Sequence, residues 1–173
     1  MTMLEGLFFF GSTSLDSTDD EKTTPMLEGL FHCNVNVSDL DRSLPFYEML
    51  GFKVIVDFRD GMSSPELATA LGLSQAKLRG VHLSVGDDPT LTRIDLVEFQ
   101  DPKTAGKPYP HLHHTGINRI SIRTKNLKQM YEDLKAKKVN FLSEPVTLPG
   151  TDFTFVCFTD PDGTVLQLVE GNL

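Results

Sequence analysis

The chain has little cysteine. Only Cys33 and Cys157 occur in 173 residues, and their spacing fits no local metal or redox motif. Both lie in apolar, strand-like runs, and we interpret them as buried free thiols in a reducing cytosol. A disulfide is the less favoured alternative, because nothing in the sequence fixes the distance between the two residues.

Long hydrophobic runs and basic clusters are also missing. No apolar run approaches the roughly 20 residues that a membrane-spanning helix needs. The apolar run at residues 7–10 is too short for a signal-peptide core and no basic residue precedes it, which predicts a cytoplasmic protein. The net charge of −8 and the lack of a basic run argue against nucleic acid and anionic membranes as partners.

Two common catalytic motifs are absent as well. No local signature of a Ser-His-Asp triad occurs, and no glycine-rich loop could hold a phosphate. A hydrophobic content of 39% and a charged content of 23% are ordinary for a globular protein. The length allows one domain, or two very small ones, with a substantial core.

Residues 1–25 read as an N-terminal extension that is flexible. They hold five acidic residues and one lysine, and residues 11–25 are mostly polar. The hexapeptide MLEGLF occurs at residues 3–8 and again at residues 26–31. We favour a duplicated start region without function. The alternative is that residues 4–10 imitate the first core strand and pair with a sheet edge, for example that of a second subunit.

The C-terminal stretch, residues 156–170, predicts a hairpin. Two apolar strands flank the turn Asp160-Pro161-Asp162-Gly163, in which proline and glycine favour the two corners. The returning strand is apolar on both faces except for Gln167. A buried amide needs a hydrogen-bond partner, so Gln167 is the first candidate for a functional residue.

An internal repeat relates this hairpin to the first half of the chain. Ile94-Asp95-Leu96-Val97-Glu98 matches residues 166–170, with Asp95 at the position of Gln167. The spacing from His32 to the helix start at residue 39 also matches that from Arg119 to residue 126. The chain therefore predicts two copies of one unit, which must pair to enclose a core or a cavity.

Hydrophobic periodicity and turn residues give the expected elements in chain order. Helices are predicted from Ser38 or Asp39 to Leu50, over residues 65–73 and over residues 126–137, and Pro45 should kink the first or shift its start. Strands are predicted over residues 29–37, 52–58, 81–85, 92–99, 116–123, 139–142 and in the closing hairpin.

Two segments carry a resemblance to a known family. Residues 31–52, FHCNVNVSDLDRSLPFYEMLGF, and residues 160–170, DPDGTVLQLVE, resemble the opening and closing parts of the vicinal oxygen chelate superfamily. This superfamily includes glyoxalase I, bleomycin-resistance proteins and extradiol dioxygenases. The resemblance implies an α+β fold with two βαβββ modules, residues 27–100 and 115–173, joined by a connector over residues 101–114. The modules would pair into a curved sheet around a cavity, and the protein would form a homodimer.

The resemblance also implies four site positions. Members that use a divalent metal such as Zn, Ni, Mn or Fe place ligands on the first and last strands of each module. These positions are His32, Asp95, Arg119 and Gln167 here, so His32, Asp95 and Gln167 are the candidate metal ligands. Arg119 cannot serve, because its guanidinium stays protonated and repels a cation. We therefore expect a degenerate metal site and favour a protein without a metal cofactor.

The family chemistry suggests a glyoxalase-like lyase or isomerase that acts on a small carbonyl or hydroxyl metabolite by proton transfer. Arg119 would hold the developing oxyanion, His32 or Asp95 would be the general base, and Gln167 would orient a carbonyl. An inert network, in which Arg119 pairs with Asp95, is the bland alternative. A bleomycin-resistance-like binder without catalysis and a metal-dependent dioxygenase are the rival functions.

Other polar and aromatic residues receive structural interpretations. We expect His111, His113 and His114 to face solvent rather than bind a metal. Glu98 and Glu170 point to the strand face opposite the pocket positions, and we interpret them as surface, edge or subunit-contact residues. The aromatic side chains of Phe46 and Tyr47 should pack the first helix on its own sheet.

Overall fold

The structure is a computed structural model that describes residues 27, 29–86, 88 and 93–172. The predicted extension over residues 1–25, with the first copy of the hexapeptide, lies outside the described residues. In the second copy, Leu27, Leu30 and Phe31 are exposed. No helix in the described part of the chain is long and apolar enough to cross a membrane.

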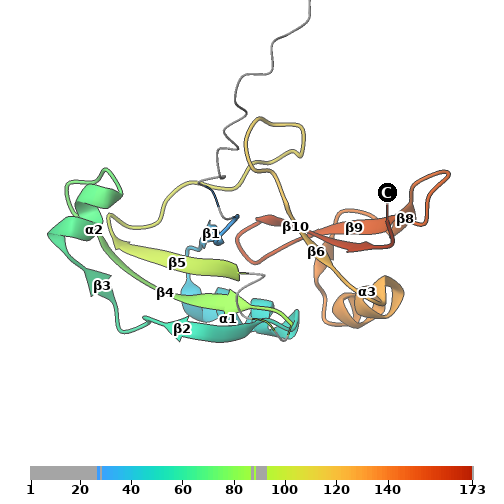
Figure 1. Cartoon of the computed structure of the whole chain (residues 1–173), viewed down its shortest axis with the longest axis horizontal. Helices are drawn as coiled ribbons and strands as arrows, with labels where there is room; N and C mark the ends of the chain where they lie inside the picture. The colour runs from blue at the N-terminus through green and yellow to red at the C-terminus, as the bar shows by residue number, and fades with distance from the viewer. Residues whose placement is uncertain (1–26, 28, 87, 89–92, 173) are drawn as a thin grey trace, which may run out of the picture.

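The first module holds one five-stranded sheet and two helices (Figure 1). Its sheet has the strand order β1-β5-β4-β2, and the short β3 pairs with β4. Its elements are β1 (Cys33–Asn36), α1 (Leu40–Met49), β2 (Lys53–Asp57), β3 (Met62–Ser63), α2 (Pro65–Ala70), β4 (Lys77–Ser84) and β5 (Arg93–Asp101).

The second module repeats this plan with one helix. Its sheet has the order β6-β10-β9-β7, and the short β8 pairs with β9. Its elements are β6 (Ile120–Arg123), α3 (Leu127–Ala136), β7 (Asn140–Phe141), β8 (Val146–Thr147), β9 (Thr154–Thr159) and β10 (Val165–Glu170). The predicted α+β class and the two βαβββ modules are therefore confirmed.

Strand register confirms the internal repeat residue by residue. The first strand of each module runs parallel to the last, with Cys33 opposite Ile94 and Ile120 opposite Leu166. Because Ile94 and Leu166 are equivalent in the repeat, His32 and Arg119 occupy the same position of their modules. Asp95 and Gln167 are equivalent in the same way.

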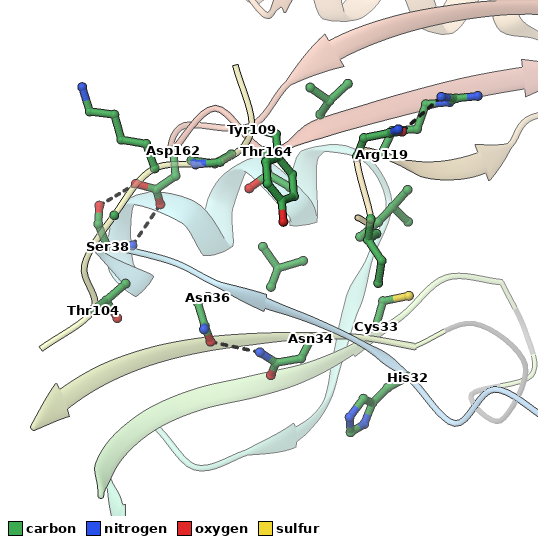
Figure 2. Close-up of a pocket in the computed structure, with 18 of the residues that line it drawn as sticks. His32, Cys33, Asn34, Asn36, Ser38, Thr104, Tyr109, Arg119, Asp162 and Thr164 are labelled. Carbon is green, nitrogen blue, oxygen red and sulfur yellow. Dashed lines mark hydrogen bonds between the residues drawn. The ribbon is translucent and has the colours of Figure 1, made fainter. Parts of the chain in front are cut away.

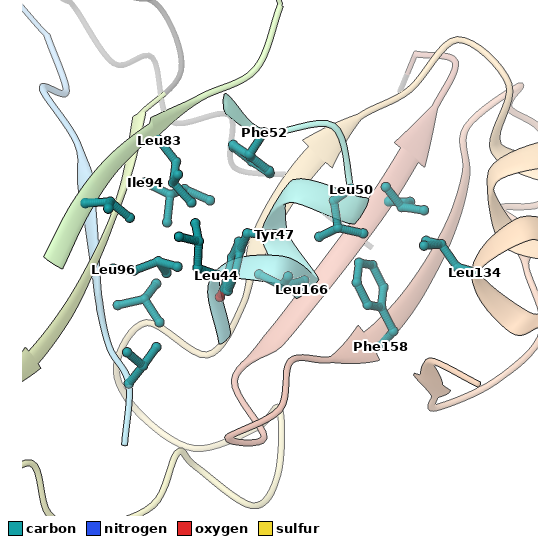
Figure 3. Packing of buried hydrophobic residues seen from close by; sticks show 14 of the residues in the cluster. Leu44, Tyr47, Leu50, Phe52, Leu83, Ile94, Leu96, Leu134, Phe158 and Leu166 are labelled. Atoms are coloured by element: carbon teal, nitrogen blue, oxygen red, sulfur yellow. The ribbon is translucent and has the colours of Figure 1, made fainter. Parts of the chain in front are cut away.

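Helix α1 lies between the two sheets and is shared by both halves of the core (Figure 3). Leu83, Ile94 and Leu96 of the first module and Leu166 of the second belong to one buried cluster. The cluster surrounds Leu44 and Tyr47 of α1 and its C-cap residue Leu50. Strand residues alternate between the two faces of a sheet. The side chains next to Ile94 and Leu166 in sequence therefore point to the faces opposite this shared core.

Each helix that follows a first strand is capped twice at its N-terminus. The side chains of Asp39 and Asn126 accept from the amides of Arg42 and Gln129, as expected of N-cap residues. A glutamate from the last strand accepts a hydrogen bond from the first amide of the helix. In each module, the distance between this amide nitrogen and the Oε2 atom of the glutamate is 2.8 Å. The two donor–acceptor pairs are Leu40 with Glu98, and Leu127 with Glu170.

These contacts correct the interpretation of Glu98 and Glu170 as surface or subunit-contact residues. Both are half-buried, and Glu98 also binds the Arg79 guanidinium at 2.9 Å. A carboxylate at a helix N-terminus meets unpaired N–H groups and the positive end of the helix dipole. The repeated glutamate is thus a structural feature of the module.

The predicted turn at residues 160–163 connects the closing hairpin to the first helix. Asp160 accepts from the Tyr47 hydroxyl at 3.0 Å, and Asp162 accepts from the Ser38 amide and from Arg42. The Phe46 ring lies 6.3 Å from that of Phe158 in the second module. Both aromatic residues therefore also contact the second module, in addition to the expected packing of α1 on its own sheet.

Several predicted bounds differ from the structure. Strand β1 is shorter than the predicted residues 29–37, because the apolar residues before it are exposed. Helix α1 starts at Leu40 and continues through Pro45, so the start is not shifted. Pro45 is exposed, where water can bind the helical carbonyl that lacks its N–H partner. The two-residue strands β3 and β8 were not predicted.

Candidate functional site

The first cluster of candidate residues lies on the sheet of the first module. Asp95 lies between the buried Ile94 and Leu96, so its side chain points to the face opposite the shared core. It is only 3% exposed, and its Oδ2 atom lies 2.8 Å from Nδ1 of His32. The His32 side chain is 37% exposed, so its ring remains accessible. The sequence-predicted base and carboxylate are therefore neighbours.

His82 is a member of this cluster that the sequence did not reveal. It lies opposite Asp95 in the β4–β5 pairing, and its Nε2 atom is 3.4 Å from the same Oδ2 atom. Its ring packs edge-on against Phe58, with 5.4 Å between the ring centroids. The signal was present only in the strand register: residues paired across an antiparallel ladder share a face.

Burial raises the pKa of Asp95, while the two imidazoles and Arg93 oppose this effect. Oδ1 of Asp95 has no hydrogen-bond partner, and the close contact with His32 Nδ1 lacks hydrogen-bond alignment. Buried polar atoms without partners are costly and uncommon. Oδ1 of Asp95 and Nδ1 of His32 can therefore still form hydrogen bonds.

The second cluster lies on the sheet of the second module. Gln167 is 6% exposed, and its Oε1 atom accepts from Ser121 at 2.6 Å and from Arg119 Nε at 3.3 Å. Asn118 Oδ1 accepts from Nη1 of the same arginine at 3.1 Å. The buried amide is thus paired, as the sequence requires, and it fixes an exposed guanidinium.

Equivalent positions carry different chemistry in the two modules. Cys157 faces Gln167 across the β9–β10 ladder, as His82 faces Asp95 in the first module. Burial raises the pKa of the Cys157 thiol, and the charge of Arg119 opposes this. The first module therefore presents imidazoles around a carboxylate, and the second presents a guanidinium held by amides.

A cavity of about 770 Å³ lies where the first strands of the two modules approach each other and the connector. His32 and Arg119 both border it, whereas Asp95 and Gln167 do not. Figure 2 shows the imidazole of His32 and the side chain of Arg119 pointing to opposite sides. The four residues thus form two pairs. Within one chain, these two pairs do not contact each other.

The donor set does not fit a divalent metal. Among the described residues, no three His, Cys, Asp or Glu side chains are arranged to hold a metal ion. The oxygen of Gln167 is already used by Ser121 and Arg119, and the guanidinium brings a positive charge to the fourth position. We therefore derive no chemical step through a metal.

Sequence comparison places these observations in a family. The profile of the Glyoxalase/Bleomycin resistance protein/Dioxygenase superfamily matches residues 29–168. The chain belongs to this superfamily. Members of the superfamily often use a divalent metal, but the residues present here leave the cofactor unassigned. No curated protein sequence matches the chain significantly.

Solved structures of the superfamily share the fold. A glyoxalase family protein from Bacillus cereus has 17% identity and a TM-score of 0.76, over 86% of this chain and 97% of that one. The trypanothione-dependent glyoxalase I of Leishmania major has 24% identity and a TM-score of 0.58, over 83% and 87% of the two chains. A domain from Frankia has 22% identity and a TM-score of 0.61, over 84% and 99%. At these identities the likeness establishes the fold and not the reaction.

The three histidines of the connector and the two cysteines were also considered in the sequence. His111 and His113 are exposed and His114 is half-buried, with ring centroids 4.9 to 5.4 Å apart. Both cysteines are free thiols; Cys157 is buried and Cys33 is half-buried. Neither group joins the two clusters of candidate residues, except that Cys157 faces Gln167.

Proposed function

We propose that the chain is a glyoxalase-like isomerase or lyase that moves a proton on a small carbonyl or hydroxyl metabolite without a metal. The observation that carries this proposal is the contact between His32 Nδ1 and the buried Asp95 carboxylate. Alignment of this contact when a substrate binds would let Nδ1–H donate to the carboxylate and leave the lone pair on Nε2. The accessible His32 ring is then a general base.

The other residues have supporting roles in this proposal. His32 would take a proton from the carbon next to the substrate carbonyl, and Asp95 would stabilise the resulting imidazolium. Negative charge develops on the carbonyl oxygen as the proton leaves. Arg119, oriented by Gln167, would bind that oxygen by charge-assisted hydrogen bonds in place of a metal ion. Return of the proton to a neighbouring atom completes an isomerisation.

We propose a homodimer as the functional unit. The pair His32–Asp95 and the pair Arg119–Gln167 lie on separate sheets of one chain, and a second copy can supply the missing pair to each. Large apolar side chains next to the site strands support this assembly, because Leu30 and Ile117 are each 80% exposed. Exposed apolar groups that lie together, as these two do around one cavity, commonly mark an interface.

Proton exchange in deuterated water tests the reaction. The wild-type chain should accelerate deuterium incorporation next to the carbonyl of hydroxyacetone, dihydroxyacetone or pyruvate, followed by NMR. His32→Gln should reduce the rate by about a hundredfold or more, as expected for loss of a general base. His113→Gln, an exposed histidine outside both clusters, should have no effect.

Equal rates for the wild type and His32→Gln would refute His32 as the base. Tight binding of a ligand without any exchange would instead favour the rival function, a non-catalytic binder. A cationic drug is the less suitable ligand for such a binder, because Arg119 has no acidic partner among the described residues.

Mixing inactive variants tests the homodimer. If each site uses two chains, His32→Ala and Arg119→Ala should each be inactive, and their mixed dimers should regain one intact site. Activity should therefore appear only after the two variants are mixed and subunits exchange. A monomer by light scattering, or mixtures as inactive as the separate variants, would exclude the shared site.

A further inference from the structure

We propose that Arg119 binds a carboxylate group of the ligand, so that the substrate class is small 2-oxo or 2-hydroxy acids. This inference rests on the proposed function for what happens to the ligand after it binds. The binding site itself can be tested without any reaction. The inference goes beyond the oxyanion role given to Arg119, because it assigns a permanent negative charge to the ground-state substrate.

The first observation is the missing counter-ion. In this acidic chain, Arg42, Arg59 and Arg79 each contact a carboxylate, with nitrogen–oxygen distances between 2.5 and 2.9 Å. Arg119 instead contacts only the neutral amide oxygens of Gln167 and Asn118. No carboxylate lies within ion-pair distance of it in the described part of the chain. Its positive charge is therefore available to an anion.

The second observation is the fixed orientation of the guanidinium. Of its five N–H groups, one on Nε and one on Nη1 donate to the two amide oxygens. Gln167 is itself held by Ser121 and is buried, so the arginine rests on an ordered support. The remaining three N–H groups include both on Nη2. A planar fork of this kind matches the two oxygens of a carboxylate, and little entropy is lost on binding.

The third observation is the charge of the neighbouring cavity. Arg119, Lys107 and Asp162 border it, together with uncharged polar side chains such as Asn36 and Tyr109. Asp162 is neutralised by Arg42, whose Nη2 atom lies 2.6 Å from its carboxylate. Lys107 forms no ion pair with a described residue. The uncompensated charge around the cavity is thus positive, although the whole chain has a net charge of −8.

The size of the cavity and the chemistry of Arg119 narrow the range of possible ligands. A volume of about 770 Å³ lies within the range of small-molecule sites. A carboxylate bound to the fork places an adjacent carbonyl or hydroxyl oxygen near the remaining N–H groups. The same arginine can then hold the carboxylate throughout and the neighbouring oxygen as charge develops on it. A 2-oxo or 2-hydroxy acid presents this arrangement of oxygens.

Oxalate and oxamide are matched probes for this site. They have the same planar shape, but oxalate carries two carboxylates and oxamide carries two neutral amides. The wild-type chain should bind oxalate by isothermal titration calorimetry, and oxamide should bind about tenfold or more weakly. Added salt should weaken oxalate binding and leave oxamide unaffected.

Arg119→Gln should weaken the binding of oxalate by about tenfold or more and leave the affinity for oxamide unchanged. Arg119→Lys keeps the positive charge but lacks the planar fork. Its oxalate affinity should therefore lie between those of the wild type and Arg119→Gln. Arg123→Gln is the control, because Arg123 ends strand β6, which follows Arg119 directly, and its guanidinium donates to the carbonyl of Gly171. A melting curve shows that each variant is folded.

The outcomes separate this inference from the proposed function. Oxalate binding that depends on Arg119, without deuterium exchange on pyruvate, would support the carboxylate site and refute the proton transfer. Exchange on hydroxyacetone as fast as on pyruvate, with oxalate affinity unchanged in Arg119→Gln, would refute the carboxylate site alone. Loss of the dimer in Arg119→Gln, with no oxalate binding to the wild type, would show that a partner's carboxylate neutralises Arg119 and would also refute it.

Discussion

Asp95 shows how a polar residue is placed by its apolar neighbours. Ile94 and Leu96 must face the shared core, so strand alternation turns Asp95 to the opposite face, where His32 and His82 meet it. The sequence predicted the His32 and Asp95 positions through the family resemblance, and the internal repeat matched them to Arg119 and Gln167. It missed His82, because its partnership depends on how two strands align across the ladder.

Gly80 is the residue at which a side chain is least tolerated on this face. A Cβ atom there would meet the backbone carbonyl of Leu96 and would lie 2.7 Å from the Phe58 ring. Gly80→Ala should lower the free energy of unfolding by about 2 to 3 kcal/mol through overpacking, measured by urea denaturation. It should also displace Phe58 from His82.

Gly72→Ala is the matched comparison for Gly80. Gly72 has φ +68°, but the space that an added methyl group would occupy is open, so only backbone strain applies. We expect a loss of about 1 kcal/mol. A loss at Gly80 no larger than that at Gly72 would contradict the steric explanation.

Among the elements, the closest correspondence between the modules is the capping of α1 and α3. In each last strand, a glutamate three residues after the site position binds the first amide of the module's helix. The helix starts could be predicted from Asp39 and Asn126, because N-cap signals are local in sequence. The glutamate contacts could not, since they join residues 58 and 43 positions apart.

Removal of either glutamate should destabilise its module. Glu98→Ala and Glu170→Ala each leave a helical amide without its partner, which should cost about 1 to 2 kcal/mol in urea unfolding. Glu98→Ala should have the larger effect, because Arg79 also loses its half-buried partner. Glu132→Ala, on the exposed side of α3, should change stability by less than about 0.5 kcal/mol. Equal effects at all three positions would refute the capping role.

At the scale of the whole molecule, the fold was more predictable than the site. Two modules and their order followed from the repeat and from hydrophobic periodicity, which are properties of contiguous segments. How the modules sit together was not predictable, because it depends on contacts such as that of Tyr47 with Asp160, 113 residues apart. For this reason the four site positions could be identified while their division into two pairs could not.

The contact of Asp162 with α1 should make stability depend on pH. Burial opposes the shift, but the hydrogen bonds from Ser38 and Arg42 lower the pKa of Asp162 below 3.8. Because the folded-state pKa is the lower one, the contribution is present above about pH 3.8 and is lost as the pH falls through the folded value. Asp162→Asn should therefore cost about 1 kcal/mol at pH 7, allowing for partial exposure.

Urea denaturation of the wild type and Asp162→Asn between pH 7 and pH 3 measures this effect. The difference in unfolding free energy should shrink toward the acid end of the range. Asp60→Asn, which changes an exposed acid, serves as the control. A difference between Asp162→Asn and the wild type that is constant over the whole range would contradict the ion-pair explanation.

The contacts between the turn at residues 160–163 and α1 also bear on biosynthesis. Ser38 and Tyr47 are translated long before their partners Asp162 and Asp160, which lie 124 and 113 residues later. While the ribosome is still making the chain, the first module therefore exposes the apolar side of α1 that the second module later covers. Such nascent surface is prone to aggregation and is a target for chaperones. Completion of the closing hairpin is the event that ends this exposure.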